Sequence, residues 1–162
     1  MKSQLVKYTE YNIWANRNHT DLISTLTEEQ IDKVQVSSFP SIRKTLYHTW
    51  DAQGIWTKRL SGGIVTDWPS KNFKGTTQDA IDNFLNSSRE FDALVKGFNE
   101  GDFHNTIEYK NLEGKEFNNT IADIVMHVMN HSTFHRGQLI SMFRDVGITE
   151  IAPTDFIFFC RL

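Results

Sequence analysis

Two histidines near the end of the chain have the residue type and the spacing of metal ligands. His131 and His135 are four residues apart, so on a helix their side chains lie on nearly the same face, one turn apart. Both imidazoles can then reach one cation, and zinc and other borderline divalent metals bind such nitrogens at about 2.0–2.1 Å. The pair therefore predicts two ligands of a divalent-metal site.

The residues around this pair have the pattern of a buried helical stripe. At steps of three and four residues the stripe consists of Ile124, Val128, His131, His135, Gln138 and Met142. Histidine pairs at this spacing also arise by chance, and a histidine on an apolar face is more often a hydrogen-bonded core residue. Three polar residues within one apolar stripe favour the metal site, because a buried imidazole without a partner costs stability.

Two histidines do not complete a metal site, so a third ligand must come from another helix. His48 is the candidate, because it lies in the middle of a second apolar segment. His19, His104 and His127 compete with it. His127 lies about 80° around the helix axis from His135, which places it in a rim or supporting position. His19 can reach the core, and His104 is expected to be exposed.

Helical periodicity predicts four long helices that would position these histidines. Their approximate ranges are 3–26, 41–60, 76–97 and 119–146. Thr27 and Gln30 have the form of a capping box before a short helical turn, and Gly147 ends the last long helix. Residues 102–118 predict a small β-hairpin. The tail after Ile148, with its run of aromatic residues, is expected to pack back on the body.

These elements predict an all-α fold class. The architecture expected is a four-helix bundle with a small β-hairpin between helices three and four, and one domain over residues 1–162. A chain of this length can bury a substantial core, because a domain of about 150 residues hides roughly 70% of the surface of its unfolded chain.

The composition argues against several other classes of function. The 17 Lys and Arg and 20 Asp and Glu are interspersed, so nucleic acid is not an expected partner. No segment approaches the roughly 18 consecutive apolar residues of a membrane span, and the first residues lack the apolar core of a signal peptide. Together with a single cysteine, Cys160, these features predict a cytoplasmic protein without disulfides or membrane partners.

The sequence resembles a known family in four places. Residues 127–138, HVMNHSTFHRGQ, closely resemble the last-helix motif of the DinB-like (DNA-damage-inducible) metalloprotein family. Three further segments agree in order and position: residues 11–16 (YNIWAN), the segment with Tyr47-His48, Trp56 and Arg59-Leu60, and residues 153–156 (PTDF). The resemblance covers almost the whole chain.

The resemblance implies a four-helix bundle whose helices run up, down, down and up, in a protein that is often dimeric. It also implies a divalent metal such as zinc, nickel or iron, held by three histidines that correspond to His48, His131 and His135. Some relatives are enzymes that use a low-molecular-weight thiol, including bacillithiol S-transferases and mycothiol-dependent isomerases, while many have no established activity. A homodimer and a small-molecule substrate are therefore expected.

Three neutral imidazoles leave a bound metal with its full charge and an open position, as in catalytic sites. A thiol bound there becomes a nucleophile, so the first hypothesis is a metal-dependent transferase that joins a low-molecular-weight thiol to small electrophiles. The alternative is a metal-dependent hydrolase that uses metal-bound water. The motif lacks the carboxylate of H-E-x-x-H, so this reaction has no obvious general base. A third hypothesis is a non-catalytic metal-binding stress protein.

Helical spacing also identifies candidates for the surroundings of the metal. Asp51 is three residues after His48 and Gln138 is three residues after His135, so both are candidates for groups that face the pocket, with an ordinary surface or core position as the alternative. Trp56 is a candidate for its lining, with core packing as the alternative.

Four more residues are candidates for functional or structural roles. Trp14 and Asn16 are candidates for the pocket lining, with core packing as the alternative for Trp14. Arg136 is either structural or a site for an anionic thiol cofactor, and Gly137 is expected to allow close approach of a neighbouring helix.

Overall fold

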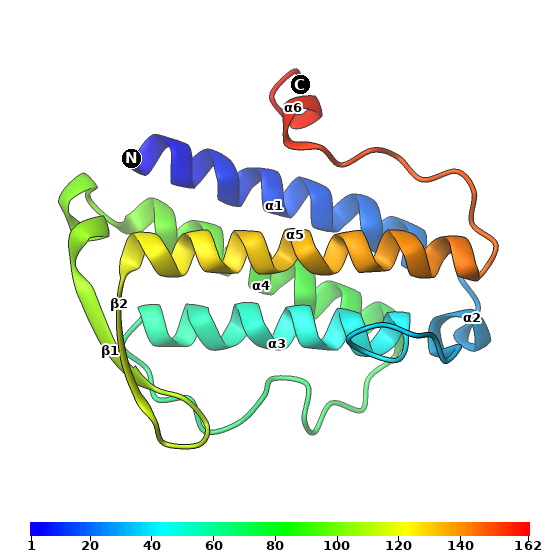
Figure 1. Ribbon diagram of the computed structural model, residues 1–162, viewed down its shortest axis with the longest axis horizontal. Coiled ribbons are helices and arrows are strands. Elements are labelled where there is room, and N and C mark those ends of the chain that lie inside the picture. Colours follow the sequence, from blue (N-terminus) through cyan, green and yellow to red (C-terminus); the bar gives the residue numbers. More distant parts are fainter.

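Four long helices contain most of the chain in the computed structural model, which describes residues 1–162 (Figure 1). The elements in chain order are α1 (Lys2–Ile23), α2 (Glu28–Asp32), α3 (Ile42–Leu60), α4 (Thr77–Gly97), the 3-10 helix η1 (Glu100–His104), β1 (Thr106–Lys110), β2 (Glu116–Thr120), α5 (Ile121–Asp145) and α6 (Phe156–Phe159). The predicted mainly helical fold and the small hairpin between the third and fourth long helices are confirmed. None of the helices is both long and apolar enough to cross a membrane.

The four long helices pack side by side, two of them antiparallel to the other two. The colours of Figure 1 show that α1 and α5 run one way and that α3 and α4 run the other way. Helices α1 and α3 each contact both α4 and α5. The connection over residues 61–76 crosses the length of the bundle, so that α4 starts beside the start of α3.

Polar side chains cap the helices that carry the histidines, close to the starts that the periodicity predicts. Ser41 Oγ accepts a hydrogen bond from Lys44 N at the start of α3, and Thr120 Oγ1 accepts one from Asp123 N at the start of α5. The predicted capping box of Thr27 and Gln30 is present and begins α2. Helix α1 ends at Ile23, three residues before the predicted end, and η1 was not expected.

The hairpin closes one end of the bundle. Its strands pair antiparallel, with Thr106 opposite Thr120 and Lys110 opposite Glu116. Arg59 of α3 donates to the carbonyl of Lys110, and its guanidinium lies 4.8 Å from the ring centroid of Tyr109. These contacts fix the hairpin to α3, since two strands alone do not form a stable core.

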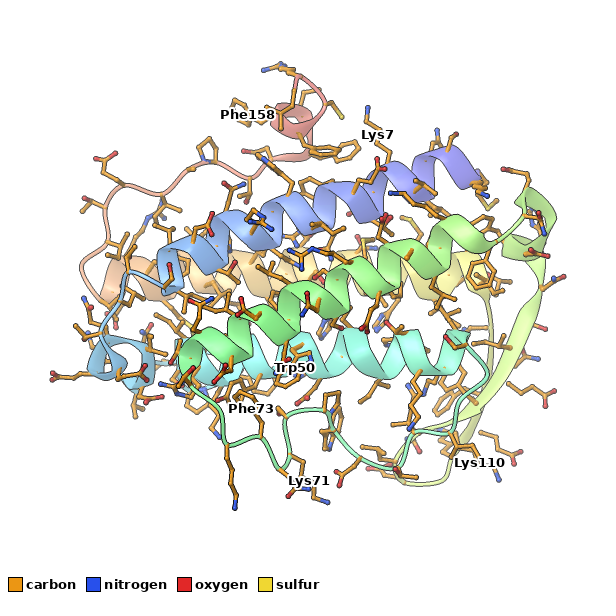
Figure 2. All side chains as sticks on the ribbon, turned by 180° about the vertical axis from the view of Figure 1, so that it is seen from behind. Lys7, Trp50, Lys71, Phe73, Lys110 and Phe158 are labelled. Atoms are coloured by element: carbon orange, nitrogen blue, oxygen red, sulfur yellow. The ribbon has the colours of Figure 1, made fainter.

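The connection over residues 61–76 is fastened to α3 by Asp51 and Trp50. The Asp51 carboxylate accepts from the backbone N–H and the hydroxyl of Ser70, at 2.6 and 2.7 Å. Figure 2 shows Trp50 of α3 beside Phe73 of the connection, and their ring centroids are 5.3 Å apart. Of the two roles considered for Asp51, the structure supports the one outside the metal pocket, because its carboxylate holds this connection.

The tail packs on α1 through part of its aromatic run. Phe156 and Phe159 lie with their ring centroids 5.2 and 5.9 Å from that of Tyr11, whose hydroxyl donates to the carbonyl of Thr154. Phe158 points away from the helices in Figure 2, while Phe156 and Phe158 are equally exposed, at 42%, and Ile157 is 53% exposed. The expected packing of the tail thus holds for one face of α6.

The core consists of two apolar clusters at the two ends of the bundle. One includes Ile23, Leu46, Phe84 and Phe143. The other includes Leu5, Leu60, Phe91, Val125 and Met129. Every long helix contributes to both clusters, so the helices are held along their whole length.

His19 lies inside this core, as its position on α1 predicted, and its side chain is only 2% exposed. Its ring meets Phe143 edge to face, and neither ring nitrogen has a hydrogen-bond partner. Burial, and then the positive charge of Arg136, lower the pKa of His19 to about 4 from its ordinary value of 6.5.

Replacement of His19 by leucine is expected to reduce the acid sensitivity of the fold. The folded state keeps the imidazole neutral down to about pH 4, while the unfolded chain protonates it near pH 6.5. The contribution of the neutral His19 imidazole to the unfolding free energy is therefore complete above pH 6.5 and is lost as the pH falls from 6.5 to 4. Between pH 7 and 4.5 the wild type should lose roughly 2–3 kcal/mol more unfolding free energy than His19→Leu, measured by urea unfolding. The control, His104→Leu, removes an exposed imidazole and should behave like the wild type. Equal losses in His19→Leu and the wild type would contradict the prediction.

Candidate metal centre

The structure brings together the three histidines singled out in the sequence. His48 Nε2 of α3 lies 2.9 Å from His131 Nε2 of α5, and His131 Nε2 lies 3.2 Å from His135 Nε2. The ligand atoms of all three lie within 4.8 Å of one another. His135 is buried, while His48 and His131 are partly exposed, so the cluster lies at the border between the core and solvent.

The other histidines lie outside this cluster. His127 is the nearest, with its ring centroid 5.9 Å from that of His131, and its ring packs against Trp56. This is the rim position expected for it. His19 lies in the apolar core, and His104 is exposed in η1. Trp56 accordingly lies near the edge of the cluster rather than among the three rings.

A buried layer of polar side chains fixes α5 against the other helices. Arg136 donates to the side-chain oxygens of Asn12 and Asn16 on α1. Asn12 also donates to Gln53 of α3, at 3.1 Å, and both Gln53 and Asn16 donate to Ser88 of α4. On each helix these residues lie between those of the two apolar clusters. The layer therefore ties all four long helices together at mid-length.

Arg136 is the charged centre of this layer. Its side chain also donates to Thr133 Oγ1, and its guanidinium lies 5.2 Å from the ring centroid of Tyr11. Only 4% of the residue is exposed, and burial lowers the pKa of Arg136. Of the two roles considered from the sequence, these contacts support the structural one. Asn16 belongs to the same layer, so it does not line the metal pocket.

Two further candidates, the exposed Gly137 and the half-buried Trp14, lie away from the three histidines. A Cβ atom placed on Gly137 would meet nothing within 4 Å, so the prediction of a close helix approach at this glycine is wrong. Trp14 packs against Phe159 of α6, with their ring centroids 5.8 Å apart. Spacing places a residue on a face of a helix, but it does not show what covers that face.

The environment of the cluster keeps its imidazoles neutral. Burial, and then the neighbouring His135, lower the pKa of His48 to about 4. Burial, followed by the nearby imidazoles of His135, His48 and His127, lowers the pKa of His131 to about 3. The pKa of His135 is also lowered by burial, against an opposing hydrogen bond with Gln138. Neutral imidazoles present the lone pairs that a cation requires.

Two of the three nitrogen separations in the cluster fit a bound metal ion. Two nitrogens that bind one ion at about 2.0–2.1 Å are about 2.9 Å apart at a right angle and about 3.3 Å apart at the tetrahedral angle. The observed separations of 2.9 and 3.2 Å fall in this range. His135 Nδ1 lies 2.8 Å from Gln138 Oε1, and when Nδ1–H donates to this oxygen, the lone pair of Nε2 faces His131.

Gln138 thus contacts a histidine of the cluster, as its spacing predicted. Two further residues near the cluster, Ser38 and Phe39, were not predicted from the sequence. Ser38 accepts a hydrogen bond from Gln138 Nε2, and the ring of Phe39 stacks on His48 with a centroid distance of 4.0 Å. Both belong to the segment before α3, which has no periodic pattern. The only sequence signal is an aromatic residue, Phe39, within a polar stretch.

Comparisons with known proteins agree with the predicted family and with the fold. The model of the DinB family matches residues 1–161. Protein DinB of Bacillus subtilis (strain 168) is 27% identical over 157 residues, which are 93% of this chain and 90% of that protein.

Two crystal structures of DinB-like proteins share the fold. The one from Bacillus cereus ATCC 10987 has a TM-score of 0.65 at 14% identity, and the match covers 86% of this chain and 89% of that chain. The one from Bacillus subtilis has a TM-score of 0.67 at 15% identity, and the match covers 91% of this chain and 97% of that chain.

Removal of one side chain from the polar layer is expected to destabilise the protein strongly. Asn12→Ala takes a partner from both Gln53 and the buried charge of Arg136, so the unfolding free energy should fall by about 2–4 kcal/mol. Urea unfolding of the metal-free protein measures this loss. Asn18→Ala is the control on the same helix, because the Asn18 amide donates only to the carbonyl of Trp14, and it should cost less than about 1 kcal/mol. Similar losses in the two variants would contradict the role given to the layer.

Proposed function

We propose that this chain, which belongs to the DinB family, binds one divalent metal ion through His48, His131 and His135. The observation that carries the proposal is that His131 Nε2 lies 2.9 Å from His48 Nε2 and 3.2 Å from His135 Nε2, separations that one ion can bridge. The family supports a bundle in which α1, α3, α4 and α5 run up, down, down and up, in keeping with the directions seen in Figure 1. The homodimer and the cytoplasmic location stay predictions.

The three histidines determine the kind of chemistry that the site can perform. A divalent ion held by three neutral imidazoles keeps its full charge and an open position, and it would lower the pKa of a thiol or a water molecule that binds there. The choice among zinc, nickel and iron follows availability as much as ligand type, because imidazole suits all of them. We therefore propose metal-dependent transfer of a low-molecular-weight thiol to a small electrophile.

The residues around the histidines favour the thiol reaction over hydrolysis. Hydrolysis needs a general base to take a proton from water, and no carboxylate belongs to the histidine cluster. Asp51, the acidic residue nearest to His48 in sequence, accepts two hydrogen bonds from Ser70. Phe39 and Trp56, in contrast, give the neighbourhood apolar surfaces suited to an organic electrophile.

The transfer balances without an oxidant or a reductant. The sulfur of the thiol forms a bond to carbon of the electrophile, for example a chlorinated aromatic. The carbon–chlorine bond breaks, and chloride leaves with the bonding electron pair. The proton of the thiol passes to solvent. The protein has to hold the two reactants together and favour the thiolate.

Metal content tests the site itself. The purified wild type, incubated with Zn²⁺ and then desalted, should retain about one ion per chain, and the double variant His131→Ala, His135→Ala should retain almost none, because one imidazole is left. His127→Ala, which removes a histidine from the same helix but from outside the cluster, should retain the wild-type amount. Elemental analysis measures each value. Full metal content in the double variant would contradict the site.

Turnover tests the reaction. Bacillithiol, glutathione and cysteine are each offered to the zinc-loaded protein with a chlorinated aromatic or a bimane as electrophile. Thioether formation above the uncatalysed rate is expected with at least one thiol, with a loss of at least about tenfold in His48→Ala. Turnover of esters or amides without a thiol would favour the hydrolase instead. Metal binding without either activity would leave a non-catalytic metal-binding protein.

A further inference from the structure

The segment between α2 and α3 forms a closed loop beside the metal centre. We call residues Gln35–Pro40 the strap. Its ends are joined by a hydrogen bond of 2.9 Å from the N–H of Gln35 to the carbonyl of Pro40. This is the sole backbone–backbone hydrogen bond made by residues 33–40. The side chain of Val36 is fully exposed, so the position of the strap depends on the contacts of its other side chains.

Two of these side chains reach the metal centre. The ring of Phe39 is stacked on that of His48, with 4.0 Å between their centroids and 24° between their planes, and its centroid lies 5.7 Å from that of His135. Ser38 Oγ accepts a hydrogen bond of 2.6 Å from Gln138 Nε2. Gln138 Oε1 in turn lies 2.8 Å from His135 Nδ1. The strap therefore contacts His48 directly and reaches His135 through Gln138.

Other side chains attach the same segment to the end of α5. Gln35 Nε2 donates to the carbonyl of Met142 at 3.4 Å. Lys33, just before the strap, donates to the carbonyl of Asp145 and lies 3.1 Å from its carboxylate. The strap thus joins α3, which carries His48, to α5, which carries His131 and His135.

We propose that Gln138 and the strap are the outer support of the metal centre and determine how tightly it holds its ion. The proposal rests on the metal site proposed above. Gln138 is a positioning residue for His135, Ser38 holds Gln138, and Phe39 holds the ring of His48. An ion that binds these histidines should in return hold the strap in place.

The chemistry of the amide supports this arrangement. An imidazole that binds a metal through Nε2 carries its proton on Nδ1, and that proton needs an acceptor. Gln138 Oε1 supplies it, which turns the amide nitrogen towards Ser38 Oγ. Each group therefore fixes the orientation of the next. Removal of such a partner of a metal-binding histidine typically weakens metal binding by 10- to 100-fold.

The first experiment measures the dissociation constant for Zn²⁺ on the full chain, by competition with a chelator. Gln138→Ala should bind Zn²⁺ about 10- to 100-fold more weakly than the wild type. Gln138→Glu should bind at least as tightly as the wild type, because its carboxylate accepts from His135 and Ser38 alike. Phe39→Ala and Ser38→Ala should bind more weakly than the wild type. Val36→Ala is the matched control within the strap and should bind normally.

Thermal unfolding separates positioning from a general loss of structure. The metal-free midpoints of Gln138→Ala and the wild type should agree, whereas the increase caused by Zn²⁺ should be smaller in the variant. Co²⁺ gives a second readout, since a reoriented His135 changes its visible absorption spectrum. An equal fall of both midpoints, with an unchanged Co²⁺ spectrum, would assign Gln138 a structural role and overturn the proposal.

Amide hydrogen exchange tests the coupling to the strap. Zn²⁺ should slow exchange across residues 35–40 in the wild type, and this protection should be lost in Gln138→Ala. A Gln138→Ala protein that binds Zn²⁺ within twofold of the wild type would overturn the strap proposal while the metal site stands. A wild-type protein that binds neither Zn²⁺ nor Co²⁺ would overturn the metal site and the strap together.

Discussion

A single buried cation, Arg136, constrains how the helices of this protein pack. Its side chain takes part in none of the salt bridges of the chain, so neutral oxygens of Asn12, Asn16 and Thr133 accommodate its charge. A buried charge that loses such partners is strongly destabilising. The apolar clusters on either side are less selective, because apolar contacts are not directional. The guanidinium therefore selects one register of α5 against α1.

The same register brings the metal ligands together. His135 directly precedes Arg136, about 100° away around the helix axis, so a guanidinium that points to α1 leaves the imidazole free to face α3. A slip of α5 by one turn would move its side chains by about 5.4 Å. Such a movement would unpair Arg136 and would also separate His131 Nε2 from His48 Nε2, which are now 2.9 Å apart. The geometry of the metal centre thus follows from a hydrogen-bonded layer that contains no metal ligand.

The sequence predicted the parts of this arrangement that depend on local periodicity. Helical spacing placed His131, His135 and Gln138 on one face, and Thr120 and Ser41 cap the helices that carry the site. The choice of His48 over His19 needed the family resemblance, because spacing shows that a residue faces inward but not which residues it meets there. The same gap explains the error at Gly137, the open choice of role for Asp51 and the omission of Ser38 and Phe39. Their surroundings come from distant or irregular segments, which local spacing does not report.

The two supports of the metal centre differ in how they are built, and this difference bears on access. The layer around Arg136 lies inside the bundle and joins its four long helices, whereas the strap is a surface loop with one backbone hydrogen bond of its own. Segments with few buried contacts and few hydrogen bonds open at lower free energy than packed helices. The strap is therefore expected to open more readily than the bundle, while the polar layer keeps the ligands in register. Because His48 and His131 are already partly exposed, such opening would widen the access of an ion or a small substrate to the histidines without unfolding the bundle.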